Sequence, residues 1–350
     1  MRYDTCDWGS LPIVLTAMAS VLLAQVKPAT PLDPIAAIVD AFRTHDIVAL
    51  GEGRHNNEQG YQFRLALIRD PRFAATVNDI VVESGSSTHQ AVMDRFIRGE
   101  DVADKELRLA WQDTTQADGT WDIPMYEEFF RAVRTVNASL PAERKLRVLL
   151  GDPPFDWEHA TREESIRISL RRDPFAAELI QREVLAKKRR ALVVYGDSHF
   201  MRRPALEGSS LVTRLVDMQA HVLNIWTHTT DADLRTLEPE IGKWRVPSLA
   251  YTAGTTLGTA PLAFYRRFGG GDDARMQDQF DAVLYLGPPS SITIRRSEIA
   301  PELCSDADYM KMRLGRMALM DPPNATAPAG VVSPSERLKR YCEGVIGKPK

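Results

Sequence analysis

The residues best suited to chemistry follow a short apolar run in VALGEGRHNNE, Val48–Glu58. Glu52 and His55 stand three positions apart there, after the expected end of a buried strand and after Gly51, which permits a tight turn. A carboxylate and an imidazole delivered together to a strand end are either a catalytic pair, in which the acid orients the base, or two metal ligands. The residues alone leave both interpretations open.

More acids and a second histidine follow other apolar runs. Glu83 ends DIVVE at 79–83, Asp152 follows LRVLL at 146–150, and His199 follows ALVVY at 191–195. Such runs are typical of buried parallel strands, whose carboxyl ends open along one edge of a sheet. We therefore expect these side chains to meet Glu52 and His55 in one polar cluster. Uncompensated buried charges are costly, so the combination favours a functional site over scattered structural residues.

Alternating strand and helix patterns predict an α/β domain. It would have a mainly parallel sheet, helices on both faces and an active cleft at the carboxyl ends of the strands. Helices are expected over 34–42, from Asn57 to about Ile68, over 124–137, from Asp173-Pro174 onwards and near 309–319. Further strands are expected at 222–226, 249–252 and 282–286. The polar stretch 99–119, with Trp111 as its large apolar residue, is expected to cover the cleft.

Composition excludes several classes of protein. With 350 residues, 44% of them hydrophobic and 26% charged, the chain can build a sizeable core as one large domain or two small ones. The formal net charge is -3, and the lack of a basic stripe argues against a nucleic-acid partner. The three cysteines show no CxxC or Cys/His spacing, which argues against a structural zinc site.

The amino terminus predicts export. Leu11–Ala24 is an apolar run of signal-peptide length, too short to span a membrane comfortably, so residues 1–24 are expected to be a signal peptide. Asp4 and Asp7 are atypical flanks, so an uncleaved anchor and a misplaced start codon stay open as alternatives. Cleavage would leave a periplasmic or secreted protein without membrane attachment.

The mature chain is expected to have three parts: a linker over 25–33, an α/β domain over 34–320 and a Pro/Ala-rich tail over 321–350. In an oxidising compartment Cys304 and Cys342 would either pair and tie down the tail or remain two free thiols.

A series of motifs runs in order along about residues 35–290. They are GEGRH at Gly51–His55, Arg64, VVES at Val81–Ser84, the stretch Trp121–Asn137, LLGDPPFDW at Leu149–Trp157, RRDPFAAELI at Arg171–Ile180, VVYGDSHF at Val193–Phe200 and FDAVLYL at Phe280–Leu286. Together they resemble the erythromycin esterase-like family, within a wider group that includes ChaN haem-binding and Tiki protease domains. The resemblance implies an α/β core with the active cleft at the strand ends.

The resemblance also implies roles for the cluster. His55 would be the general base that takes a proton from water, and Glu83 or Glu52 would hold its tautomer. His199 and Arg64 would lie near the ester oxygen and stabilise developing negative charge. No metal, cofactor or serine nucleophile is implied for that reaction.

This chain departs from the family next to both histidines. Arg54 precedes His55, where it would lower the pKa of the histidine or bind an anionic substrate. Asp197 adds a carboxylate near His199, which favours a cation site. We take Arg54, Asp152 and Asp197 as candidate substrate-binding residues. The chain is shorter than typical macrolide esterases, so a macrolide is not the expected substrate.

Three functions remain open at this stage. The first is a hydrolase that cleaves a small-molecule ester or lactone with water activated by His55. The second is a protein like ChaN or Tiki that binds a divalent transition metal or haem through Glu52, His55, Glu83 and His199. The third is a non-catalytic exported binding domain that keeps the cluster as scaffold.

Overall fold

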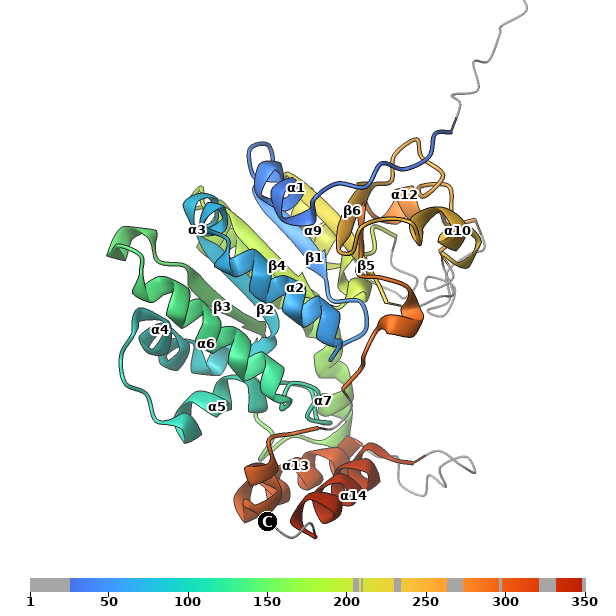
Figure 1. The fold of residues 1–350 in the computed structure, drawn as a ribbon. Coiled ribbons are helices and arrows are strands. Elements are labelled where there is room, and N and C mark those ends of the chain that lie inside the picture. Colours follow the sequence, from blue (N-terminus) through green and yellow to red (C-terminus); the bar gives the residue numbers. More distant parts are fainter. Residues whose placement is uncertain are drawn as a thin grey trace, which may run out of the picture.

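One seven-stranded sheet organises the computed structural model, which describes residues 26–203, 208, 210–229, 234–262, 273–295, 298–320 and 332–347 (Figure 1). The strands are β1 (Ile47–Gly51), β2 (Asp79–Ser86), β3 (Arg147–Asp152), β4 (Ala191–Tyr195), β5 (Val222–His228), β6 (Ser248–Tyr251) and β7 (Ala282–Tyr285). The α-helices are α1 (Pro34–Ala41), α2 (Glu58–Arg69), α3 (Pro71–Thr76), α4 (Gln90–Arg98), α5 (Asp104–Gln112), α6 (Pro124–Ala138), α7 (Arg162–Arg167), α8 (Arg172–Ile180), α9 (Leu211–Asp217), α10 (Glu238–Ile241), α12 (Met276–Gln279), α13 (Ala307–Met320) and α14 (Pro334–Ile346). Short 3-10 turns include η3 (Ile168–Arg171), η5 (Asp197–Phe200) and η8 (Pro301–Ser305).

The strand order is β3-β2-β4-β1-β5-β7-β6, and only β6 runs antiparallel to its neighbour. β1 lies at the centre, where Leu50 pairs with Val194 of β4 and Ile225 of β5. Because the parallel strands are in step, the residues that follow β1, β2, β3, β4 and β5 emerge along one edge. The predicted α/β fold with a mainly parallel sheet is confirmed.

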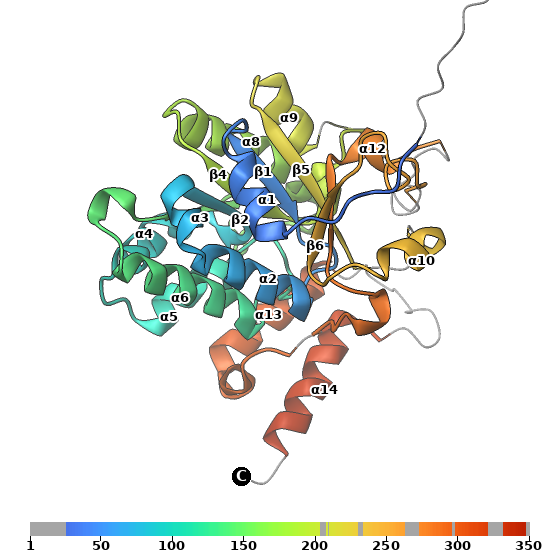
Figure 2. The same ribbon diagram turned by 45° about the horizontal axis from the view of Figure 1, so that its top comes forward.

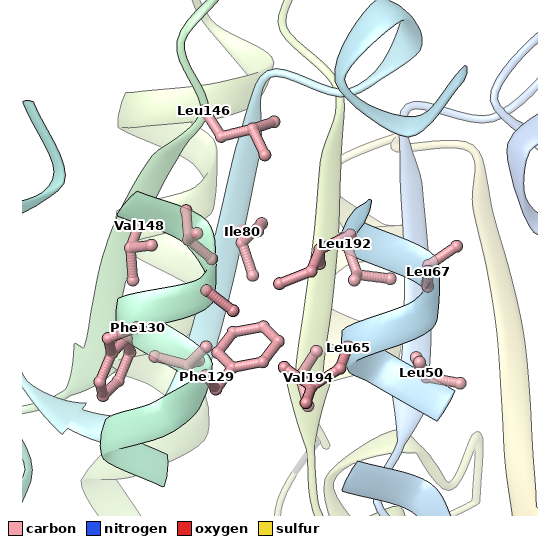
Figure 3. Packing of buried hydrophobic residues seen from close by; sticks show 14 of the residues in the cluster. Leu50, Leu65, Leu67, Ile80, Phe129, Phe130, Leu146, Val148, Leu192 and Val194 are labelled. Atoms are coloured by element: carbon pink, nitrogen blue, oxygen red, sulfur yellow. The ribbon is translucent and has the colours of Figure 1, made fainter. Parts of the chain in front are cut away.

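Helices cover both faces of the sheet, with α1, α2 and α6 on one side and α8 and α9 on the other (Figures 1 and 2). Alternate residues of β1 serve the two layers: Val48 and Leu50 belong to the core under α2 and α6, and Ile47 and Ala49 to the opposite core. Figure 3 shows α2 and α6 side chains packed on the sheet in the first core. This two-sided burial explains why the strands read as unbroken apolar runs.

The C-terminal helices form a small unit with its own core. Residues of η8, α13 and α14, among them Leu303, Met317 and Leu338, pack together in a separate buried cluster. Cys304 and Cys342 are joined by a disulfide, so the structure has the bonded pair and not two free thiols. The expected Pro/Ala-rich tail thus contains a helix, and α13 and α14 lie side by side at one end of the molecule (Figures 1 and 2).

The predicted signal peptide over 1–24 and residues 321–331 of the predicted C-terminal tail lie outside the residues that the structure describes. The expected linker is fixed to the domain, since Leu32 and Leu249 exchange backbone hydrogen bonds of 2.8 and 3.1 Å. Within the described part of the chain, no helix is long and apolar enough to cross a membrane.

Two local predictions differ in detail from the structure. Within the stretch 99–119, Trp111 belongs to α5 and its buried ring stacks on Phe130, with ring centroids 5.6 Å apart, whereas Thr115 contacts Asp152 at the end of β3. The helix expected to open at Asp173-Pro174 is α8, which begins one residue earlier, at Arg172, directly after η3. Pro174 is tolerated because a proline in the first helical turn lacks only an N–H that would have no partner.

Candidate active site

His55, Glu52 and Arg64 form a chain of contacts after β1. The Nδ1 atom of His55 lies 2.8 Å from Oε2 of Glu52, and the other carboxylate oxygen lies 3.0 Å from Nη2 of Arg64. The Glu52 and Arg64 side chains are buried, whereas the His55 side chain is 32% exposed. The carboxylate therefore fixes one nitrogen of the imidazole and leaves Nε2 to face the site.

The backbone around this chain of contacts is itself held in place. Gly53 has a φ of 68°, a left-handed conformation that side chains rarely adopt, so the turn occurs here. Gly51, expected to provide the turn, is instead a strand residue, and a Cβ there would come within 1.8 Å of Oδ1 of Asp197. Asn57 caps α2 through the Gly60 amide and donates to the carbonyl oxygen of Glu52 at 2.7 Å.

A second chain of contacts joins β2 to the residues after β4. Glu83 accepts a hydrogen bond from the Gly196 amide at 2.8 Å, and its other oxygen lies 3.2 Å from Nε2 of His199. Nδ1 of His199 contacts Oδ1 of Asp173 in α8. His199 therefore lies between two carboxylates, Glu83 and Asp173, one on each side of its ring.

The two chains of contacts meet at Gly196. A Cβ built there would lie 3.0 Å from Cε1 of His55 and 3.6 Å from Oε2 of Glu83. Only the absent side chain lets the His55 ring approach the strand end that also holds Glu83 and His199. The structure thus brings together five predicted residues, namely Glu52, His55, Arg64, Glu83 and His199.

Burial and mutual charges set the ionisation of the cluster. Burial disfavours the charged form of Glu83, but His199, His55 and Arg172 hold its pKa well below its usual range. For His199 burial lowers the pKa, yet Glu83 and Asp173 outweigh it and raise the pKa to about 10. At neutral pH His199 is therefore an imidazolium that lies between two carboxylates.

Burial and neighbouring charges also shift the pKa values of His55 and Glu52. Burial disfavours the charged imidazole, but the hydrogen bond to Glu52 and the charge of Glu83 raise the pKa of His55 above its usual value. Burial also opposes ionisation of Glu52, and the charge of Arg64 with the His55 hydrogen bond lowers its pKa nevertheless. Glu52 is thus a carboxylate, and His55 titrates above its ordinary range.

The three candidate substrate-binding residues lie at the margins of this cluster. Asp152 is buried and accepts hydrogen bonds from the amide and hydroxyl of Thr115 at 2.6 and 2.7 Å, while burial raises its pKa to about 6. Asp197 is buried against the Gly53 amide at 3.3 Å, and burial raises its pKa to about 8. Arg54 is exposed, with its amide bound to Thr229. Only Arg54 presents its side chain to solvent.

Sequence reasoning missed several residues that touch the cluster. Arg172 lies 3.8 Å from Glu83 and 3.5 Å from Asp152, and its Nε donates to Thr115. The buried ring of Trp121 meets the His55 ring edge-on, with centroids 4.8 Å apart. Both residues, like Asp173, stand in motifs that carry the family resemblance, but their types also suit a helix start or a core.

The cluster does not fit a resident divalent metal as it is arranged. Metal ligands must present free nitrogen or oxygen lone pairs, yet Nδ1 of His55 and Nδ1 of His199 are each engaged by a carboxylate. Across the described ranges, no group of three or more His, Cys, Asp or Glu residues is placed to hold a metal ion. The haem alternative stays a prediction.

The ionisation of His199 predicts how stability depends on pH. A pKa near 10 in the folded state, against about 6.5 when unfolded, contributes stability that is complete below pH 6.5 and is lost as the pH rises towards 10. We expect the free energy of unfolding of the wild type to fall by a few kcal/mol over that range. His199→Gln should flatten this slope in urea titrations at pH 6, 8 and 10. His159→Gln is the control: it should keep the slope of the wild type, because His159 pairs with Asp156 on the surface.

Known proteins were compared with the chain as a whole. No family model matches it, and no curated protein matches it. Solved structures with a similar fold include a succinoglycan biosynthesis protein, with 10% identity, a TM-score of 0.52 and a match over 74% of this chain and 94% of that one. A protein from Bacillus cereus has 11% identity, a TM-score of 0.51 and a match over 74% of this chain and 95% of that one. They also include a mutant erythromycin esterase, EreC, in its open conformation, with 12% identity, a TM-score of 0.46 and a match over 71% of this chain and 92% of that one. At such identities these similarities concern the fold alone.

Proposed function

We propose that the protein is a hydrolase in which His55 activates water to attack an ester or lactone carbonyl. One observation carries the proposal: Nδ1 of the partly exposed His55 is bound to a buried carboxylate, which leaves Nε2 as the acceptor for a proton. An imidazole whose tautomer is fixed by an acid is the usual arrangement of a general base. The fold shared with an esterase is compatible with it but supplies no argument about mechanism.

The proposed reaction begins with a water molecule hydrogen-bonded to Nε2 of His55. As its oxygen bonds to the carbonyl carbon, its proton passes to Nε2, and Glu52 stabilises the imidazolium that forms. The tetrahedral intermediate then expels the alkoxide, which takes the proton back from His55. The products are a carboxylic acid and an alcohol, or a hydroxy acid if the substrate is a lactone, and no covalent enzyme intermediate is formed.

Positive charge near the developing oxyanion comes from buried groups. His199 and Arg64 were expected to lie beside the ester oxygen, but the His199 ring lies between Glu83 and Asp173, and Arg64 directs Nη2 at Glu52. Each charge is shared with at least one carboxylate, so we propose that these two residues contribute only part of the stabilisation of the oxyanion. Arg54, exposed beside the base, is proposed to contact an anionic part of the substrate.

Hydrolysis of a panel of small esters and lactones, with and without a chelator, tests the proposal. Product formation that survives chelation and rises with enzyme concentration is the expected result. Activity that requires added divalent metal, or a Soret band on titration with haem, would favour the metal- or haem-binding function. An inert panel together with tight binding of an uncleaved ligand would favour the non-catalytic binding domain.

The pH dependence of hydrolysis carries a further prediction. A general base works unprotonated, and the pKa of His55 is raised, so kcat/KM should increase with pH and reach half its maximum above pH 6.5. Glu52→Gln removes the carboxylate that raises this pKa, so the midpoint should move to lower pH. The plateau should also fall, by about 100-fold or more, because the tautomer is no longer fixed. Glu58→Gln is the control, since Glu58 pairs with Arg295 at 2.5 Å and should leave both quantities unchanged.

A further inference from the structure

The segment 112–122 connects the catalytic cluster to the C-terminal unit. Near its start, Thr115 donates to Asp152 and accepts from Arg172, which in turn lies near Glu83. At its end, Trp121 packs edge-on against His55. The segment therefore contacts His55 directly and reaches Glu83 through Arg172, although no residue within it takes a proton in the proposed reaction.

Arg313 of α13 lies inside this segment. Its side chain is 1% exposed, and its guanidinium donates to the carbonyl oxygens of Gln112, Gln116 and Ala117 at 2.9, 3.1 and 3.3 Å. The segment is thus wrapped around one buried cation that comes from about 200 residues further along the sequence. A fork of several N–H donors suits this role, which a lysine ammonium cannot reproduce.

Asp122 completes the connection next to Trp121. Its carboxylate accepts from Nη2 of Arg313 at 2.9 Å and from the hydroxyl of Tyr309 at 2.5 Å. Gly119, with a φ of 72°, lets the backbone pass beside the guanidinium, since a Cβ there would lie 3.1 Å from Nε of Arg313. Two residues of α13, Arg313 and Tyr309, therefore fix the backbone position from which the Trp121 ring reaches His55.

We infer that Arg313 is a positioning residue for His55, which it orients by holding the segment 112–122 and its Trp121 ring against the imidazole. The C-terminal unit, closed by the Cys304–Cys342 disulfide, supplies the helix that carries it. This inference rests on the proposed function only for its kinetic consequence, because the orientation of the imidazole can be measured without a substrate.

The test compares His55 imidazole resonances in ¹⁵N- and ¹³C-labelled protein. Trp121→Leu removes the ring and defines the resonance positions without its ring-current shift. We expect Arg313→Lys to move the His55 resonances towards those of Trp121→Leu, and Tyr309→Phe to move them part of the way. The milder Tyr309→Phe decides the question if Arg313→Lys does not fold.

Met317→Ala is the matched control. Met317 lies on the same helix and is buried in the C-terminal cluster, so its truncation should cost stability without touching the segment. It should leave the His55 resonances in place. Wild-type resonances in both Arg313→Lys and Tyr309→Phe, or an equal displacement in Met317→Ala, would overturn the inference.

The kinetic consequence follows separately. In an active preparation Arg313→Lys should lower kcat by about 10- to 100-fold with little change in KM, because a displaced base affects the chemical step more than binding. Resonance changes without any hydrolysis in the wild type would uphold the positioning role and reject the proposed function. Hydrolysis by the wild type, with unmoved His55 resonances in Arg313→Lys and Tyr309→Phe, would support the proposed function and reject the positioning role.

Discussion

Replacing His55 by glutamine is expected to lower kcat/KM for ester or lactone hydrolysis by about 10²–10⁴-fold, the usual contribution of a general base. Glutamine preserves polarity and approximate size but cannot accept and return a proton. A glutamine side chain can also still donate to Glu52, so the substitution removes little packing around the cluster. Circular dichroism and the thermal unfolding midpoint should therefore stay close to those of the wild type.

His159→Gln is the matched control for that measurement. His159 also has Nδ1 bound to a carboxylate, Asp156 at 2.7 Å, but it lies on the surface outside the cluster. Its loss should leave kcat/KM unchanged within about twofold. Wild-type turnover in His55→Gln would mean that another group activates the water.

Replacing Glu83 by glutamine is expected to destabilise the fold by about 3–5 kcal/mol at pH 7, the cost of breaking a buried ion pair from one side. The loss would leave the His199 imidazolium without one of its two carboxylates and Arg172 with one fewer buried partner. The pKa of Glu83 is held low, so its contribution is present above about pH 4.3 and is lost only in stronger acid.

Urea unfolding at pH 7 measures this effect. Glu163→Gln serves as the control, because Glu163 pairs with Arg167 on an exposed helix and such pairs are worth about 0–1 kcal/mol. A loss below about 1 kcal/mol in Glu83→Gln would show that the pair adds little to stability. In that case the charged state assigned to His199 would also be in doubt.

The strands could be predicted from sequence because their burial is local in the chain. β4 was expected over the same five residues that form it, since a short apolar run with β-branched residues, followed by glycine, favours a buried strand over a helix. The same logic placed Glu52 and Glu83 at one edge of the sheet. The helix caps Asp33 and Asn57 could also be predicted, because Asp and Asn are preferred residues at N-caps. In the structure each side chain accepts a hydrogen bond from the amide three residues ahead.

The remaining parts depend on contacts between distant residues. Asp173 has the sequence signature of a helix start, and only the folded chain directs its carboxylate to His199. Arg313 had no local signal at all, because its partners lie in a segment about 200 residues away. Helix α14 did have a signal, the Ser333-Pro334 start, which a Pro/Ala-rich composition nearby obscured.

The central claim is that unprotonated His55 is the group that activates water. The most direct test is to titrate the His55 imidazole by NMR in the free protein and compare its pKa with the midpoint of the acidic limb of kcat/KM. The account predicts that the two values coincide and lie above 6.5, because Glu52 and Glu83 raise the pKa of this residue. A kinetic midpoint that differs from the His55 titration, or that persists unchanged in His55→Gln, would contradict it.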